Sequence, residues 1–196
     1  SDSRRRAGSS PAWSAPAPTG RRSPPDAYRG GVSDAAEPTR NVSTDPDVIT
    51  VERVIPAEAA AIFALVADAT RHKDIDGSGT VVAAKGDPEP LALGSTFGMA
   101  MKMGVPYSMV STVIEFEPDR RIAWQTTGPG KIGAHVGGRI WRYELEPVDG
   151  GTRVCESWDI SQESFFTKPV VKAFASKETA ANMAKTLERI EGLVAP

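Results

Sequence analysis

Hydrophobic and polar residues change their spacing along the chain, and each change marks an element of secondary structure. Residues 48–55 are rich in β-branched side chains, which predicts a strand. Residues 57–68 repeat their apolar side chains at helical spacing, and Pro56 suits a first helical turn because its missing N–H is not needed there. The apolar positions of this helix share one face: Ile62, Leu65, Val66 and Ala69. A second short helical piece, residues 69–74, follows.

Six further segments have the length and composition of strands and are separated by turn residues. They are residues 80–86, 95–103, 107–117, 120–127, 138–147 and 152–161. Two of the separators, Glu117-Pro118-Asp119 and Asp149-Gly150-Gly151, are tight hairpin sequences. Because such short connections join antiparallel neighbours, these segments predict an antiparallel sheet.

The last apolar pattern is that of a long helix, residues 169–194, with Pro169 in its first turn. Its apolar stripe consists of Met183, Leu187, Ile190 and Val194. So regular a stripe requires a buried partner, and the concave face of the sheet is the large surface left for it. The element order predicts an α+β helix-grip fold, in which a curved antiparallel sheet wraps around the C-terminal helix and two short helices follow the first strand. We expect a ligand cavity between sheet and helix.

The first 46 residues differ in composition from the rest. They contain no Leu, Ile, Phe or Met and hold seven of the 16 prolines and seven arginines. This predicts a disordered Pro/Arg-rich extension, residues 1–46, before one ligand-binding domain, residues 47–196. The clusters Arg4-Arg5-Arg6 and Arg21-Arg22 leave open a contact with acidic partners or a targeting segment. The simpler interpretation is a non-native or mis-assigned extension.

Charge and cysteine content narrow the functional classes. The formal net charge of −2 gives no general attraction to nucleic acid, so we expect no nucleic-acid partner. No apolar run approaches the ~20 residues of a membrane span, so we expect no stable membrane insertion. A single cysteine, Cys155, excludes an intramolecular disulfide, and residues 1–46 lack the apolar stretch of a secretory signal. Both observations favour a cytoplasmic protein.

Several stretches of the chain match a known group of proteins. These are the opening VERVIPAEAAAIFALVADATRH, the segment IDGSGTV, the hairpins EFEPDRRIAW and WRYELEPVDGGTRVCESWDIS, and the final amphipathic helix. Over residues 47–194 the chain resembles the SRPBCC superfamily (START and Bet v 1-like helix-grip proteins), in its polyketide cyclase/dehydrase-like branch. The resemblance implies the helix-grip fold. Because the superfamily includes lipid carriers, plant ligand-binding proteins and aromatic ring cyclases, it does not imply one activity.

Alternation along the predicted strands indicates which side chains face the cavity. One face of residues 95–103 carries a phenylalanine and three methionines, whose flexible thioethers suit an irregular apolar ligand as well as ordinary core packing. The predicted ligand pocket consists of Phe97, Met99, Met101, Met103, Trp124, Trp141, Tyr143, Glu156, Trp158, Met183 and Leu187.

Two charged residues interrupt these apolar faces. Arg139 shares a face with Trp141 and Tyr143, and Glu156 shares one with Trp158. Burying either charge alone is costly, whereas pairing or ligand contact relieves the cost. Three interpretations remain open: a pocket acid and base that orient a polar ligand group, a structural Arg–Glu ion pair, or an arginine that reaches solvent.

The two histidines complete the catalytic candidates, which are Glu156, Arg139, His72 and His135. His72 lies between the predicted first helices and the sheet, and His135 lies in a Gly-rich loop, residues 128–138, that could act as a lid. Either could carry a proton near neutral pH, although a lone histidine is more simply a surface residue.

Residues 74–81 copy the first eight positions of a calcium-binding EF-hand loop. The twelfth position, which requires a bidentate Glu, is Lys85, so the pattern favours an Asp/Gly turn and no metal site. No phosphate-binding loop or dinucleotide fingerprint occurs in the sequence, and no cofactor is expected.

The function favoured by these patterns is the binding of a hydrophobic small molecule or lipid in the cavity between sheet and C-terminal helix. The alternative is a polyketide cyclase/dehydratase-type enzyme with Glu156 as its acid/base. A structural or interaction role with a filled cavity is a third interpretation.

Overall fold

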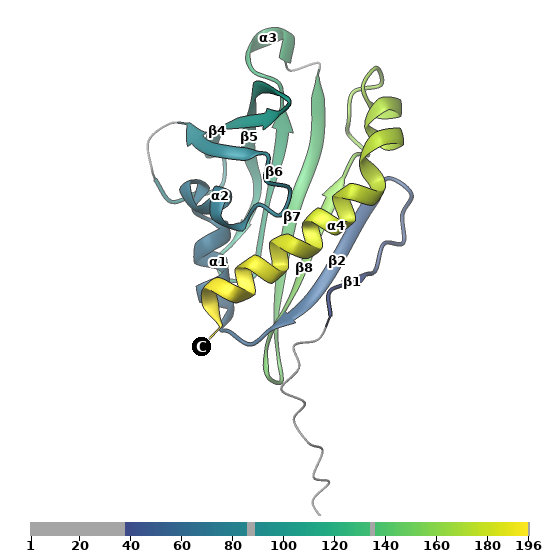
Figure 1. Cartoon of the computed structure of the whole chain (residues 1–196). Helices are drawn as coiled ribbons and strands as arrows, with labels where there is room; N and C mark the ends of the chain where they lie inside the picture. The colour runs from purple at the N-terminus through teal and green to yellow at the C-terminus, as the bar shows by residue number, and fades with distance from the viewer. Residues whose placement is uncertain (1–37, 86–88, 134–135, 196) are drawn as a thin grey trace, which may run out of the picture. The chain divides into compact units, whose positions relative to one another are not determined.

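The computed structural model of the chain describes residues 38–85, 89–133 and 136–195. Figure 1 shows one antiparallel sheet with a long helix lying across one face. The predicted curved antiparallel sheet with a C-terminal helix is therefore confirmed. No helix within these residues is long and apolar enough to cross a membrane.

Eight strands form the sheet in the order β1-β2-β8-β7-β6-β5-β4-β3, and every neighbouring pair is antiparallel. The strands are β1 (Arg40–Asn41), β2 (Val48–Ile55), β3 (Val81–Lys85), β4 (Thr96–Met103), β5 (Val105–Glu117), β6 (Arg121–Thr127), β7 (Gly137–Val148) and β8 (Gly151–Asp159). Strands β3 to β8 follow one another as a meander, because each short connection returns the chain beside the strand it has just left. β2 then pairs with β8, so the beginning and end of the domain meet in the sheet.

The helical elements connect strands or follow the last one. They are α1 (Ala59–Val66), the 3-10 helix η1 (Ala69–Arg71), α2 (His72–Ile75), α3 (Gly130–Gly133) and α4 (Lys168–Val194). Helix α1 begins later than predicted, because Glu58 is still extended as its N-cap residue. Pro56 therefore lies before the helix and not in its first turn.

A short strand precedes the predicted start of the domain. β1 pairs with β2 in a register that sets Arg40 opposite Glu52, and the side chains of these two residues form an ion pair at 2.8 Å. Thr39 accepts a hydrogen bond from Arg53 of β2 at 3.1 Å. The structured region thus includes residues that composition had assigned to the extension. The predicted disorder of residues 1–37 lies outside the described residues.

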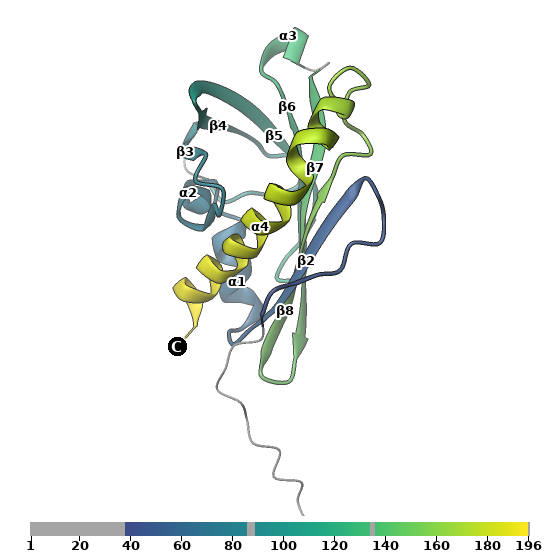
Figure 2. The ribbon, with the colours of Figure 1, turned by 45° about the vertical axis from the view of Figure 1, so that its right-hand side comes forward.

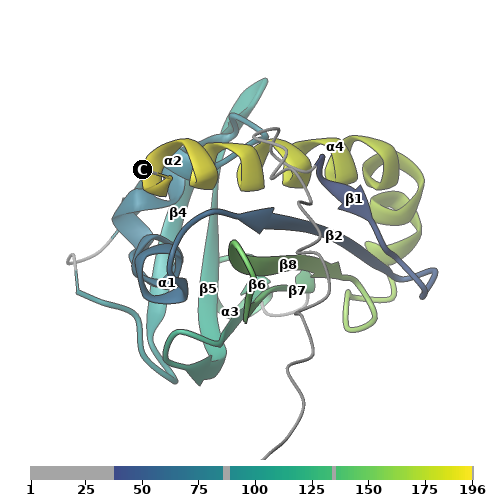
Figure 3. The ribbon, with the colours of Figure 1, turned by 90° about the horizontal axis from the view of Figure 1, so that it is seen from below.

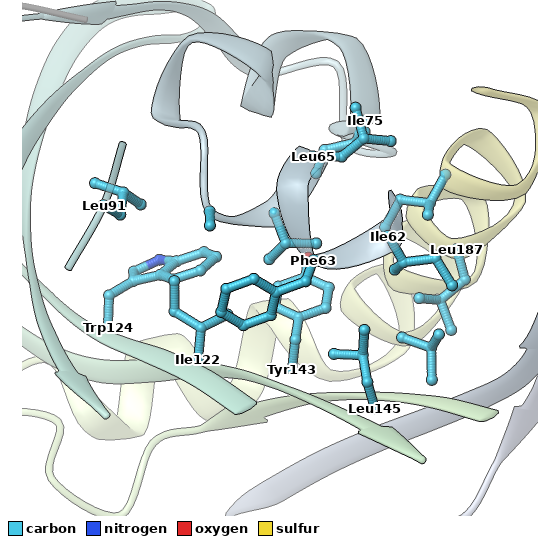
Figure 4. Packing of buried hydrophobic residues seen from close by; sticks show 14 of the residues in the cluster. Ile62, Phe63, Leu65, Ile75, Leu91, Ile122, Trp124, Tyr143, Leu145 and Leu187 are labelled. Carbon is cyan, nitrogen blue, oxygen red and sulfur yellow. The ribbon is translucent and has the colours of Figure 1, made fainter. Parts of the chain in front are cut away.

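Helix α4 runs diagonally over the concave face of the sheet and packs against β2, β8, α1 and α2 (Figures 1 and 2). Seen from below, the sheet bends around the space under α4 (Figure 3). The predicted stripe faces that space, since Met183, Leu187 and Ile190 are all fully buried. Figure 4 shows Leu187 near Ile62 of α1.

A close backbone approach fixes α4 against the turn after α2. A Cβ added at Gly77 would lie 2.0 Å from the carbonyl oxygen of Asn182, so only glycine fits there. The Gly77 N–H donates to Thr186 Oγ1 at 3.0 Å, and the Arg189 guanidinium donates to the carbonyl oxygen of Asp76. The Asp-Gly turn that sequence analysis singled out is therefore the contact between the first helices and the last one.

The core fills the concave side of the sheet (Figure 4). Phe63 of α1 points toward the sheet and packs edge-on against Phe116 of β5, with ring centroids 5.4 Å apart. On neighbouring strands, Ile122 of β6 is paired in register with Tyr143 of β7 and points the same way. One continuous apolar layer results, and the candidate site is embedded in it.

Candidate functional site

The site centres on two side chains that the register of β7 and β8 brings together. Tyr143 lies directly opposite Glu156, and the tyrosine hydroxyl donates to Oε1 of the carboxyl at 2.8 Å. The second oxygen, Oε2, is buried and has no hydrogen-bond partner among the described residues. One oxygen of Glu156 is thus satisfied by the protein, and the other is not.

Burial controls the ionisation of this pair. Glu156 is 2% exposed, and burial raises its pKa to about 8; the hydrogen bond from Tyr143 opposes the rise, and the charge of Asp76 adds to it. Burial and then the charge of Glu156 raise the pKa of Tyr143 well above its ordinary value. Glu156 is therefore mostly protonated at neutral pH. Because Oε1 accepts from Tyr143, the proton is carried by Oε2, which can donate it in a hydrogen bond.

Aromatic rings continue from Tyr143 along the inner side of the sheet. Tyr143 stacks on Trp124 with centroids 5.7 Å apart, and Trp124 stacks on His72 at 5.0 Å. Phe97 packs edge-on against both His72 and Trp124. We term these four rings, Phe97, His72, Trp124 and Tyr143, the aromatic row; Glu156 is hydrogen-bonded to Tyr143.

His72 is a buried member of this row and not a surface residue. Its Nε2 lies 2.8 Å from the carbonyl oxygen of Val66, and since a carbonyl can only accept, Nε2 carries the hydrogen. Burial lowers the pKa of His72, so the ring is neutral at pH 7. The surface interpretation of His72 is wrong. A catalytic role for His72 stays a prediction.

Arg139 does not pair with Glu156. It lies four residues before Tyr143 on β7, a separation of about 13 Å along a strand. Its guanidinium donates to both carboxylate oxygens of Glu163, from Nε at 3.1 Å and from Nη2 at 3.3 Å. The structural ion pair therefore exists, but its acid is Glu163, which sequence analysis missed because it lies in a loop without periodicity.

The other predicted pocket residues lie on the same concave side of the sheet. Trp141 of β7 and Trp158 of β8 are opposite each other, with ring centroids 6.3 Å apart. Met101 and Trp141 are half-buried. The buried members are Phe97, Met99, Trp124, Tyr143, Glu156, Trp158, Met183 and Leu187. His135 and the side chain of Met103 lie outside the described residues.

Surface hollows of the described residues lie away from these buried side chains. The described surface has a hollow of about 300 Å³ at the edge of the sheet, where Met101 and Tyr107 line it, and another of about 390 Å³ beside Arg121 and Cys155. Neither includes Glu156. The cavity expected between sheet and α4 therefore stays a prediction, since these two hollows lie elsewhere.

Further polar groups near the site were not predicted. Ser111 and Thr126 form a buried hydroxyl pair at 3.0 Å on the inner face of β5 and β6. The carboxylate of Asp76 accepts from the backbone N–H groups of Ser78 at 3.0 Å and Val81 at 2.8 Å. These bonds hold the turn that resembles a calcium loop, and they account for Asp76 without a metal.

The geometry can now be compared with known proteins. The sequence model of the family described as polyketide cyclase / dehydrase and lipid transport matches residues 47–195. The chain belongs to this family. Membership in the polyketide cyclase / dehydrase and lipid transport family confirms the resemblance drawn from the sequence.

Curated relatives share sequence with the chain, and solved structures share its fold. The uncharacterized protein Rv0088 of Mycobacterium tuberculosis is 36% identical over 120 residues, which cover 60% of this chain and 50% of that protein. The chain thus spans about half the length of the curated relatives it matches. Protein Ms6760 from Mycobacterium smegmatis shares the fold with a TM-score of 0.60 at 16% identity, covering 80% of this chain and 97% of that one. The di-domain ARO/CYC StfQ from the steffimycin biosynthetic pathway has a TM-score of 0.59 at 10% identity, covering 76% of this chain and 50% of that one.

Proposed function

We propose that the concave side of the sheet binds a hydrophobic small molecule or lipid that carries one polar group, and that Glu156 orients this group. The observation that supports the proposal is the unpartnered Oε2 of Glu156. Buried polar atoms in native proteins almost always have a hydrogen-bond partner, and leaving one without a partner costs about 1–3 kcal/mol. A ligand oxygen at Oε2 removes this cost.

The surroundings of Glu156 suit an apolar ligand body. Trp124 and Trp158 offer large flat surfaces, and Met99 and Met183 can repack around irregular shapes. Because Glu156 is buried, a ligand reaches it only if side chains move. Flexible methionines make such movement less costly than a rigid β-branched core would.

Access to the site is proposed at the end of the sheet where the inner side chains are half-buried. Met101 and Tyr107 lie opposite each other there, at the ends of β4 and β5. Burial raises the pKa of the Tyr107 hydroxyl, and the charge of the Arg139 guanidinium partly offsets the rise. This end combines an apolar wall with polar groups. Such a combination is typical of a pocket mouth.

A pair of probes that differ only in a polar group tests the proposal. We expect 2-naphthol to quench or shift the emission of the inner tryptophans more strongly than 2-methylnaphthalene, which has a methyl group in place of the hydroxyl. Glu156→Leu should abolish this preference and leave the affinity for 2-methylnaphthalene within about twofold. Cys155→Ser is the matched control, since Cys155 is the neighbour of Glu156 on β8 and its thiol points toward Glu52 of β2. Equal preference in the wild type and in Glu156→Leu would refute the role of Glu156.

The second candidate function is an enzyme of the cyclase/dehydratase type, favoured by the same carboxyl. A carboxyl that is still protonated at neutral pH can act as a general acid. In that case Glu156→Gln should still bind substrate but lose turnover by about 100-fold or more, because the amide cannot transfer a proton. Wild-type turnover should also fall above pH 8. An unchanged turnover in Glu156→Gln would reject the enzymatic function.

A further inference from the structure

Two adjacent aromatic side chains project from the loop between β8 and α4. Phe165 and Phe166 are each 85% exposed, and their rings pack edge-on against each other with centroids 5.8 Å apart. Val170, in the first turns of α4, is 59% exposed. We call Phe165, Phe166 and Val170 the aromatic tip. Large apolar side chains gathered at one place on a surface mark an interaction site.

The backbone under the tip is held firmly, so the rings are presented outward by the fold. The Glu163 side chain is fully buried, and its carboxylate accepts from Arg139 and from the hydroxyl of Thr167 at 2.7 Å. The Ser164 N–H donates to the carbonyl oxygen of Gly137 at 2.9 Å. A Cβ at Gly138 would lie 2.1 Å from the carbonyl oxygen of Gln162. The Arg139–Glu163 pair thus anchors the loop.

The segment that carries the tip contains lysines but no acidic residue of its own. Residues 164–177 contain Lys168, Lys172 and Lys177 and no Asp or Glu, although the whole chain has a net charge of −2. Lys168 and Lys172 both contact one carboxylate, that of Asp47, each at 2.6 Å. One acid therefore offsets two lysines, and the segment keeps a positive excess.

We propose that the aromatic tip docks on an anionic lipid surface. Exposed aromatic rings beside lysines are the combination that inserts into the headgroup region of a membrane, where the rings meet acyl chains and the lysines meet lipid phosphates. Three side chains at the end of a loop are too few for a stable protein interface, which buries about 800 Å² on each partner. Figures 1 and 2 show this loop and the first turns of α4 beside the upper end of β7. This surface goes beyond the proposed ligand site and does not depend on it.

Vesicle sedimentation tests the proposal. The full chain should sediment with vesicles of phosphatidylcholine and phosphatidylglycerol at 7:3, and less with phosphatidylcholine alone or at 0.5 M salt. Replacing both rings, Phe165→Ser with Phe166→Ser, should reduce binding at least tenfold. The matched control is Leu93→Ser, which removes an apolar side chain that is 67% exposed elsewhere on the surface. Lys168→Gln with Lys172→Gln should reduce binding only to the anionic vesicles.

Two results would overturn the proposal. The first is that the wild-type protein does not bind the 7:3 vesicles. If the wild type then self-associates with rising concentration and the double phenylalanine variant does not, the tip binds a second copy of the chain. The second is that the double phenylalanine variant binds the 7:3 vesicles as strongly as the wild type does. The double variant should keep the wild-type melting temperature and the naphthol preference, so failure here is distinguishable from failure of the proposed ligand site.

Discussion

The hydroxyl of Tyr143 donates to one carboxyl oxygen of Glu156 at 2.8 Å, while the other oxygen is buried without a partner in the described part of the chain. A hydrogen-bonded pair of this kind would be fully satisfied in a purely structural core. The fold buries this second oxygen, the same burial raises the pKa of Glu156, and the proposed ligand would supply the missing hydrogen-bond partner.

Replacing this carboxyl changes how stability depends on pH. Glu156 has a pKa of about 8 in the folded protein and an ordinary value of 4.5. The unfolded chain therefore ionises first, and the folded state loses stability as pH rises from about 4.5 to 8. Glu156→Gln has no such loss, since an amide does not ionise and its oxygen still accepts from Tyr143. The difference in unfolding free energy, variant minus wild type, should therefore be larger at pH 8 than at pH 5 by a few kcal/mol, since each pKa unit corresponds to ~1.4 kcal/mol.

Urea unfolding at pH 5, 6.5 and 8 measures this difference. The amide adds its own cost, but that cost is the same at each pH, so only the change with pH matters. Cys155→Ser, on the same strand, should follow the wild type between pH 5 and pH 6.5. If Glu156→Gln and the wild type differ by the same amount at pH 5 and pH 8, the carboxyl is not buried as described.

The stripe of α4 can be tested at its centre. Leu187 is fully buried, so Leu187→Ala should cost about 2–5 kcal/mol of unfolding free energy through lost burial and the remaining cavity. Leu193 on the same helix is 49% exposed, and Leu193→Ala should change stability by less than about 0.5 kcal/mol. Chemical denaturation of both variants makes the comparison. Equal, small losses would show that α4 does not lie against the sheet.

The approach of the α2–β3 turn to α4 predicts a strong effect of one methyl group. Gly77→Ala brings its Cβ against the backbone of Asn182, so we expect a loss of about 1–3 kcal/mol or failure to fold. Gly192→Ala is the control, because a Cβ there meets no neighbouring atom within 4 Å and alanine favours a helix by up to about 1 kcal/mol. Thermal melts compare the two variants. Equal melting temperatures for Gly77→Ala and Gly192→Ala would contradict the close approach of Gly77 to Asn182.

Two N-terminal deletions locate the start of the folded region. Composition predicts that removing residues 1–37 leaves the melting temperature within a few degrees. Removing residues 1–46 also deletes β1 and the contact of Thr39 with Arg53, so it should lower the melting temperature further. Differential scanning calorimetry of both proteins measures this. A drop of ten degrees or more on removing residues 1–37 would mean that this segment contributes to the domain.

Local patterns were enough to predict the sheet, the long helix and the inward direction of Glu156. Alternation along β8 set Glu156 with Trp158 on the buried side, and both are buried. The stripe of Met183 and Leu187 predicted the burial of α4 in the same way. These features depend on the period of one element, which the sequence shows directly.

The partners of the charged residues depend on register and loops, which the sequence does not show. The turn between β7 and β8 sets the register of the two strands, and this register places Tyr143 opposite Glu156. In the same register Arg139 lies four residues away from the position opposite Glu156. The acid that holds Arg139 comes from a loop without periodicity, at Glu163. Whether a cavity stays open depends on how side chains fill it, and periodicity carries no information about that.

Native mass spectrometry of the protein purified from the organism that makes it tests the central claim most directly. The account predicts a species heavier than the 20.8 kDa chain by the mass of one small hydrophobic molecule, and this molecule should be released on denaturation. The same preparation of Glu156→Leu should show mostly the chain alone. A wild-type protein that has the bare chain mass under native conditions, and gains no mass when incubated with 2-naphthol, would contradict the proposed ligand site.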